Sequence, residues 1–163
     1  MAAVPEQATK FDQVAFLTGG SVLDEGEALG SDRLRGAAGS MLMQTFHIAY
    51  ELGGAQAVEA LPGGPQWLAV IQATPEHERH LAVHTGHLLH LNDADTAAWN
   101  AGAHTLLEHA TLTGTASQVR TRVEDLSGAG VTEIVYQPTG DIPRELEHFA
   151  NAMGLPSKAE ASR

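Results

Sequence analysis

The chain has no cysteine, few aromatic residues and few basic residues. Without cysteine it can form no disulfide, no cysteine-based zinc site and no thiol nucleophile, which fits a reducing compartment. Nine Lys and Arg stand against 20 Asp and Glu, which gives a formal net charge of −11 at pH 7. Such a surface repels phosphate backbones, and no basic stripe with interleaved aromatics offsets it, so we expect no nucleic-acid partner.

Long apolar runs are also lacking. No run approaches the roughly 20 apolar residues that a membrane-spanning helix needs. The first residues, MAAVPEQATKFDQ, contain no basic region followed by an apolar run, so they do not resemble a secretory signal. We therefore expect a cytoplasmic protein with no membrane partner.

The chain has the length and apolar content of one globular domain. Its 163 residues are 43% hydrophobic, which is enough to bury a core. We expect a single α/β domain over residues 1–153. Residues 154–163 combine Gly, Pro and polar residues without periodicity and are predicted to form a flexible tail.

The first half of the chain is predicted to contain one strand followed by helices. Residues 11–24 are rich in β-formers, but Gly19 and Gly20 interrupt them and favour a bulge, a bend or a close backbone approach. Ser31 is a suitable N-cap for a long helix that Gly53-Gly54 should end. Further helical segments are expected over residues 55–61, 66–73 and 103–110.

Residues 110–153 are predicted to form a strand-helix-strand-helix unit. Residues 111–113 are a short strand candidate, and Thr115 with Gln118 has the Thr-x-x-Gln pattern of a capping box that begins a helix. The β-rich residues 132–137 follow, and Pro143 begins the last helix. The connection is long enough for parallel strands. With the first strand, this gives a helix-rich α/β fold with about three parallel strands.

A family resemblance rests on the same residues. LTGTASQVRTRVEDLSGAGVTEIVYQPTG and IPRELEHFA resemble the C-terminal end of luciferase-like monooxygenases and F420-dependent oxidoreductases, and RHLAVHTGHLLHLNDAD and VLDEGEALGSDRLRGAAG extend the similarity more loosely. The resemblance implies a partial TIM-barrel-like (β/α) segment, from barrel strand six to helix eight. A complete TIM barrel takes about 250 residues, so this chain would leave strand edges open. We expect a separately encoded N-terminal barrel half, self-association or a smaller open fold to cover them.

The resemblance also implies a function and a cofactor. It indicates a flavin- or F420-dependent oxidoreductase that uses FMN or coenzyme F420 on a small molecule. Gly114 and Thr115 form a glycine turn at a helix N-terminus, a place that suits phosphate, although an ordinary capped loop explains the turn equally well. Gln137 and Gly140 follow the last strand, and family analogy puts them on the same rim.

Five closely spaced histidines are the most conspicuous polar cluster: His77, His80, His84, His87 and His90. At about 100° per residue, the first four would share one face of a helix, so two or three imidazoles could reach one metal. Gly86 interrupts that helix, no HExxH motif is present, and the resembling family is not one of metalloenzymes. We therefore predict no metal ligands and consider His84 and His87 as catalytic candidates, with surface and packing roles as the alternative.

Three functions remain open from the sequence. The first is a barrel segment of the oxidoreductase family that needs a partner half or self-association for activity. The second is a non-catalytic module that self-associates or binds a small ligand, and the third is a histidine-rich metal-binding protein. No GxGxxG, Walker or GxSxG motif adds a fourth.

Overall fold

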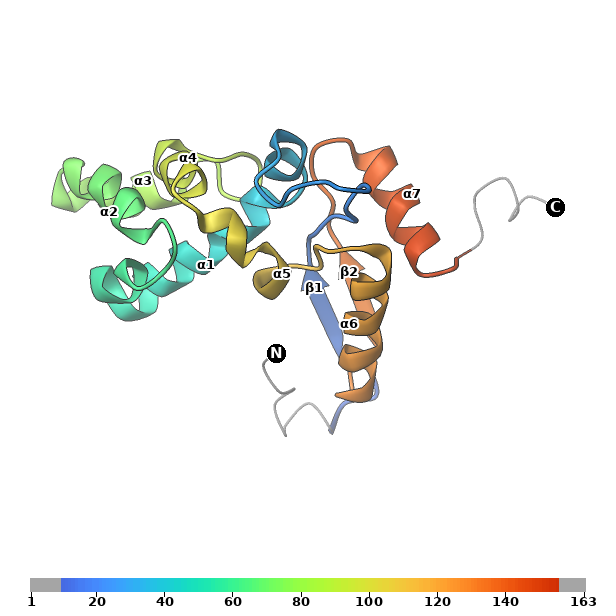
Figure 1. The fold of residues 1–163 in the computed structure, drawn as a ribbon. Coiled ribbons are helices and arrows are strands. Elements are labelled where there is room, and N and C mark those ends of the chain that lie inside the picture. Colours follow the sequence, from blue (N-terminus) through green and yellow to red (C-terminus); the bar gives the residue numbers. More distant parts are fainter. Residues whose placement is uncertain (1–9, 156–163) are drawn as a thin grey trace.

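The computed structural model describes residues 10–155, which form a helical body joined to a smaller α/β part (Figure 1). The helix-rich α/β class expected from the sequence is confirmed at this level. The elements, in chain order, are β1 (Ala15–Thr18), α1 (Asp32–Glu59), α2 (Gly64–Ala73), η2 (Glu76–Glu78), α3 (Arg79–His84), α4 (Asp93–Asn100), η3 (Ala103–Leu106), α5 (Leu107–Ala110), α6 (Ala116–Gly128), β2 (Glu133–Tyr136) and α7 (Ile142–Ala152).

The described residues contain a sheet of two parallel strands. Its register runs from Ala15 opposite Glu133 to Thr18 opposite Tyr136. The strand β1 ends at Thr18, and two residues later Gly20 has φ +156° and an added Cβ would lie 2.4 Å from the backbone of Leu112. The predicted interruption at this glycine pair is therefore confirmed, and its cause is the close approach of another backbone segment.

The third predicted strand, over residues 111–113, does not form. This segment makes an isolated parallel bridge, in which Gly114 pairs with Val22, and a further hydrogen bond from the Leu112 N–H to the Gly19 carbonyl at 2.9 Å. The guanidinium of Arg122 donates hydrogen bonds to the carbonyl oxygens of Thr111 and Thr113. The groups of this segment that face residues 19–23 are the Leu112 and Gly114 amides, so Arg122 occupies its opposite edge. No second bridge follows, and the described sheet has two strands.

The helix ends lie where local sequence chemistry puts them. Ser31 caps α1 by accepting a hydrogen bond from the Leu34 amide at 3.1 Å. Gly54 interrupts α1 with φ 65° and ψ −163°, as expected for the glycine pair. Thr115 and Gln118 form the predicted capping box of α6.

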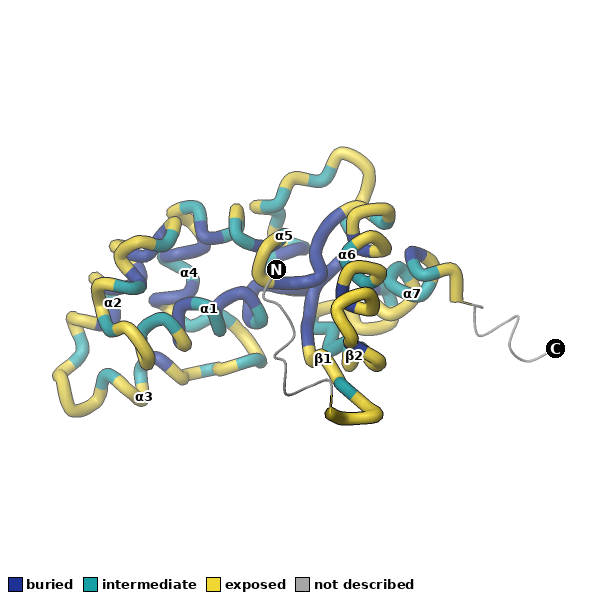
Figure 2. Tube along the Cα trace, turned by 90° about the horizontal axis from the view of Figure 1, so that it is seen from below, coloured by how far each residue is buried: buried dark blue, intermediate teal, exposed yellow. Residues whose placement is uncertain are grey.

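Most of the core lies in the helical body. Phe46 of α1, Trp67 of α2 and Trp99 of α4 are buried there (Figure 2). The α/β part has only two small apolar clusters, one around Val119 and one around Leu126. The helical body therefore buries much more apolar surface than the sheet and its two helices do.

One face of the sheet is covered and the other is not. Ile134 packs towards α6, and the Tyr136 ring stacks on Phe149 of α7 with centroids 4.3 Å apart. Side chains alternate along a strand, so Val135 points to the opposite face, where Leu17 lies beside it in register. Leu17 is 59% exposed and Val135 43% exposed. This face presents apolar side chains to solvent.

Helix α7 exposes an apolar residue and buries a charged one. Leu146 is 49% exposed, whereas Glu145 beside it is only 1% exposed. No helix within residues 10–155 is long and apolar enough to cross a lipid bilayer. Most of the tail predicted over residues 154–163 lies outside the described residues.

Candidate functional site

Ligands of parallel α/β sheets bind beyond the carboxyl ends of the strands, so the segments after β1 and β2 are the first place to look. At this end lie the loop after β1, the loop after β2, and the bridge of Gly114 to Val22. All four predicted cofactor-binding residues belong to these segments.

Gly114 and Thr115 have their amides already in use. The Gly114 N–H donates to the Ser21 carbonyl at 3.2 Å, and the Thr115 N–H donates to Oε1 of Gln118 at 2.8 Å. An added Cβ on Gly114 would lie 2.5 Å from the Arg122 guanidinium, so a larger residue here would have to displace that side chain. For an anion at the start of α6, the amides of Ala116 and Ser117 are the remaining donors.

A groove of about 440 Å³ adjoins this helix start. Its neutral polar groups are an imidazole, two hydroxyls and a side-chain amide. The Glu108 carboxylate in the groove accepts a hydrogen bond from Gln118 at 3.1 Å. Burial lowers the pKa of Arg122, which nonetheless remains the groove's cation. The lining residues are Glu108, His109, Ser117, Gln118, Thr121 and Arg122.

Gln137 and Gly140 lie in the loop after β2, and both make backbone contacts. The Gln137 N–H donates to the Thr18 carbonyl at 2.8 Å and so continues the strand pairing. Gly140 has φ +69°, and an added Cβ would lie 3.3 Å from the carbonyl group of Gly36 in α1. Gly140 thus allows the loop to pack on α1. Neither residue lines the groove beside α6.

A charged network at the same end of the sheet was missed from the sequence. The buried Glu145 carboxylate accepts hydrogen bonds from Ser21 Oγ at 2.6 Å, Arg33 Nη1 at 2.8 Å and Arg144 Nη1 at 2.7 Å. Arg33 also forms an ion pair with Glu27. These residues come from the loop after β1 and from the first turns of α1 and α7, so the network ties three segments together. In the sequence, the one indication of a buried Glu145 is that it lies four residues before the apolar Phe149, on the same face of the last helix.

The network shifts the protonation of two of its groups. Burial alone would raise the pKa of Glu27, but hydrogen bonds from Arg33 and Ser31 and the Arg33 charge outweigh it and lower that pKa to about 2. Burial raises the pKa of the Tyr136 phenol, and the Glu145 charge raises it further. The Tyr136 hydroxyl donates to the Gly20 carbonyl at 2.7 Å. Tyr136 therefore stays a neutral donor at this end of the sheet.

The five spaced histidines do not share one helix. Helix α3 ends at His84, and residues 85–89 form turns in which Gly86 has φ +71°. His77 and His80 are exposed on the segment before the turn. The single-face arrangement considered from the sequence is therefore wrong, because the helix stops after two turns at most.

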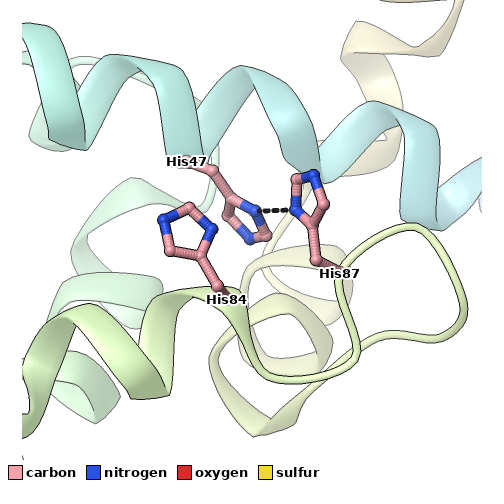
Figure 3. Close-up of side chains that lie close together, drawn as sticks. All are labelled: His47, His84 and His87. Atoms are coloured by element: carbon pink, nitrogen blue, oxygen red, sulfur yellow. Dashed lines mark hydrogen bonds between the residues drawn. The ribbon is translucent and has the colours of Figure 1, made fainter.

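A sixth histidine completes a different cluster. His47, buried in the middle of α1, lies against His84 and His87 (Figure 3). Its Nδ1 is 3.0 Å from Nδ1 of His87, and its ring centroid is 5.5 Å from that of His84. Ring nitrogens of the three residues lie within 4.8 Å of one another. The two catalytic candidates are thus brought together, but in the helical body and with a partner distant in sequence.

Two of these imidazole rings, those of His47 and His84, each have a carboxylate oxygen near the Nε2 atom. Asp95 Oδ1 lies 3.2 Å from Nε2 of His47 and also accepts a hydrogen bond from the Trp67 indole at 2.9 Å. Glu51 Oε1 lies 3.2 Å from Nε2 of His84. Burial lowers the pKa of His87, and the neighbouring imidazoles lower it further. His87 is therefore neutral at neutral pH and keeps a nitrogen lone pair.

Comparison of the chain with protein-family models, curated proteins and solved structures found no match.

Proposed function

We propose that this chain is the C-terminal segment of a flavin- or F420-dependent luciferase-like oxidoreductase, active only when a separately encoded N-terminal half completes the barrel. The observation that carries the proposal is the parallel pair of β1 and β2, covered on one face and open on the other. Parallel strands with helices on one face are the elements of such a barrel; in a complete barrel residues 111–113 would lie between β1 and β2, which here pair directly.

The open face and open edges supply the physical reason for a partner. A sheet of two strands is marginal in water, and unpaired edge groups favour pairing with further strands. Within residues 10–155, β1 and β2 pair only with each other. Further strands would satisfy the outer edges and would bury Leu17 and Val135, which lie on the face that becomes a barrel interior.

The groove beside α6 is where this segment would meet the phosphate end of the cofactor. The Ala116 and Ser117 amides, the Ser117 hydroxyl and the helix dipole all favour an anion there. Gln118 restrains the Glu108 carboxylate in the same groove. The amides and the hydroxyl fit a phosphate, whereas the Glu108 carboxylate opposes one. The bound flavin or deazaflavin would supply the hydride chemistry.

The proposal is tested by cofactor binding. Fluorescence titrations with FMN and with coenzyme F420 are carried out on the full chain, alone and with a candidate N-terminal half. We expect saturable binding of one cofactor in the completed complex. Absence of binding to both cofactors in either state would overturn the proposal.

A charge placed at the helix start sharpens the test. Ser117→Asp suits the first turn of α6 but repels phosphate, so we expect cofactor binding to weaken at least about tenfold. Ser127→Asp adds the same charge at the far end of the same helix and should leave binding unchanged. Equal effects of the two variants would place the cofactor elsewhere.

The exposed sheet face also favours a second function, that of a non-catalytic self-associating module. In that case the chain alone forms a stable homodimer that buries Leu17 and Val135, and it binds neither cofactor. Sedimentation velocity combined with the same titrations separates the two functions.

A further inference from the structure

We propose that His47, His84 and His87 bind a divalent transition metal, with Zn²⁺ the best-suited ion. The three residues each offer a ring nitrogen, and these nitrogens lie within 4.8 Å of one another. Imidazole is a preferred ligand of zinc, nickel and copper, and three histidines with one open position form a known type of zinc site. The proposal is independent of the oxidoreductase function.

The spacing of the rings suits a shared ion. Zn–N bonds of about 2.0–2.1 Å at tetrahedral angles put ligand nitrogens about 3.3 Å apart. The Nδ1 atoms of His47 and His87 are 3.0 Å apart, and the three ring centroids are 5.2 to 5.5 Å from one another. Small side-chain rotations therefore bring all three nitrogens to bonding distance of one position.

Asp95 fixes the tautomer that a metal needs at His47. A carboxylate accepts a hydrogen bond, so Asp95 holds the proton of His47 on Nε2 and leaves a lone pair on Nδ1, which faces His87. Asp95 is itself buried and held by the Trp67 indole and the Asn92 amide. A histidine oriented by a carboxylate in this way is the usual arrangement behind a metal ligand.

Glu51 performs the same function for His84. It accepts from Nε2 of His84 and so leaves Nδ1 as the atom for the shared position. Figure 3 shows the three rings turned towards one another from α1 and from the chain at the end of α3. All three residues thus present Nδ1, and two of them have a carboxylate on the opposite nitrogen.

The surroundings leave a fourth coordination position to solvent. His47 is buried, whereas His84 and His87 are exposed. Water or a small exogenous ligand can therefore complete a tetrahedral zinc, as in sites with three protein ligands. The ion would also join the turn after α3 to the middle of α1.

The experiment is a zinc titration of the full, untagged chain after treatment with a chelator. A competing chromophoric chelator reports affinity, and elemental analysis reports stoichiometry. We expect one Zn²⁺ per chain. His84→Ala and His87→Ala should each weaken binding about 100-fold or more, since even loss of a residue behind a ligand costs 10- to 100-fold.

Matched controls lie on the same segment. His77→Ala and His80→Ala remove exposed imidazoles outside the cluster and should leave affinity and stoichiometry unchanged. Because His84 and His87 are exposed, their variants should fold, which circular dichroism verifies. Glu51→Gln should weaken zinc binding about tenfold while keeping all three ligands.

Three results would overturn the proposal: less than one tightly bound Zn²⁺ per chain, unchanged affinity in both ligand variants, or equal losses in the ligand and control variants. None of them bears on cofactor binding at the sheet, because that titration contains no metal.

Discussion

At the scale of single residues, the buried carboxylate of Glu145 holds two arginines in place. It accepts from Arg33 and Arg144 and is 1% exposed. Glu145→Ala removes the buried carboxylate that both guanidinium groups share, although Arg33 keeps Glu27 and Arg144 keeps Asp24, so we expect a loss of about 2 kcal/mol in the free energy of unfolding. Urea denaturation measures it. Glu147→Ala, at an exposed position of the same helix, should change stability by less than about 0.5 kcal/mol.

The lowered pKa of Glu27 makes stability depend on pH. Its folded-state pKa of about 2 lies below the usual 4.5. The stabilisation is therefore complete above about pH 4.5 and is lost as the pH falls towards 2. The free energy of unfolding, obtained from urea denaturation between pH 6 and pH 3, should fall less steeply for Glu27→Gln than for the unchanged chain, by on the order of 1–3 kcal/mol across this window.

Glu25→Gln is the matched control for that pH series. It removes the same charge from an exposed position two residues away, and the steep acid dependence should persist. A pH dependence that is identical in Glu27→Gln and the unchanged chain would show that the ion pair with Arg33 does not carry it.

Residues that act through distant contacts could not be predicted from the sequence. His84 and His87 were found because they are close together in the chain, whereas His47 is 40 positions before its partner His87. Glu145 was hidden for the same reason, since Ser21 and Arg33 reach it from the other end of the chain. Sequence spacing predicts which side chains share a helix face only while the helix continues. Here α3 ends at His84 and Gly86 lies in the turn that follows, so the helical spacing does not apply to His87.

At the scale of elements, helix ends were predictable because their causes are local. The capping box of Thr115 and Gln118 involves residues three positions apart and needs no tertiary contact. Thr115→Ala should therefore destabilise the chain by about 1 kcal/mol and increase amide exchange in the first turn of α6. Thr121→Ala, exposed within the same helix, should be neutral or slightly stabilising. Equal amide exchange in both variants would mean that the cap is not formed in solution.

Short strands were less predictable than helices. Residues 133–136 and 111–113 both carry β-formers, yet only the first group forms a strand. Residues 111–113 reach residues 19–21 through the Leu112 amide, and their outward carbonyl groups, on Thr111 and Thr113, are taken by Arg122. Its position in α6 puts it opposite these carbonyls only after the chain has folded. β-propensity therefore indicated where a strand was possible but not whether it would find a partner.

At the scale of the whole molecule, the α/β class followed from local patterns, but the division into two unequal parts did not. Burial of Trp67 and Trp99 concentrates the core in the helical body, and the sheet is left with one covered face. The barrel itself stays a prediction, because it depends on strands that residues 10–155 do not contain. The uncovered sheet face carries exposed apolar side chains, and we expect it to associate with a partner or with a second copy of the chain.

That association gives the prediction at this scale. In sedimentation velocity, the full chain alone should self-associate as its concentration rises, because Leu17 and Val135 gain burial on contact. Leu17→Lys puts a charge on that face and should keep the chain monomeric, at little cost to the isolated fold since Leu17 is 59% exposed. Leu52→Lys changes a leucine that is 86% exposed on α1 and should associate like the unchanged chain. If Leu52→Lys alone abolished association, the contact would lie on the helical body, and the sheet face would lose its place as the site where a barrel partner docks.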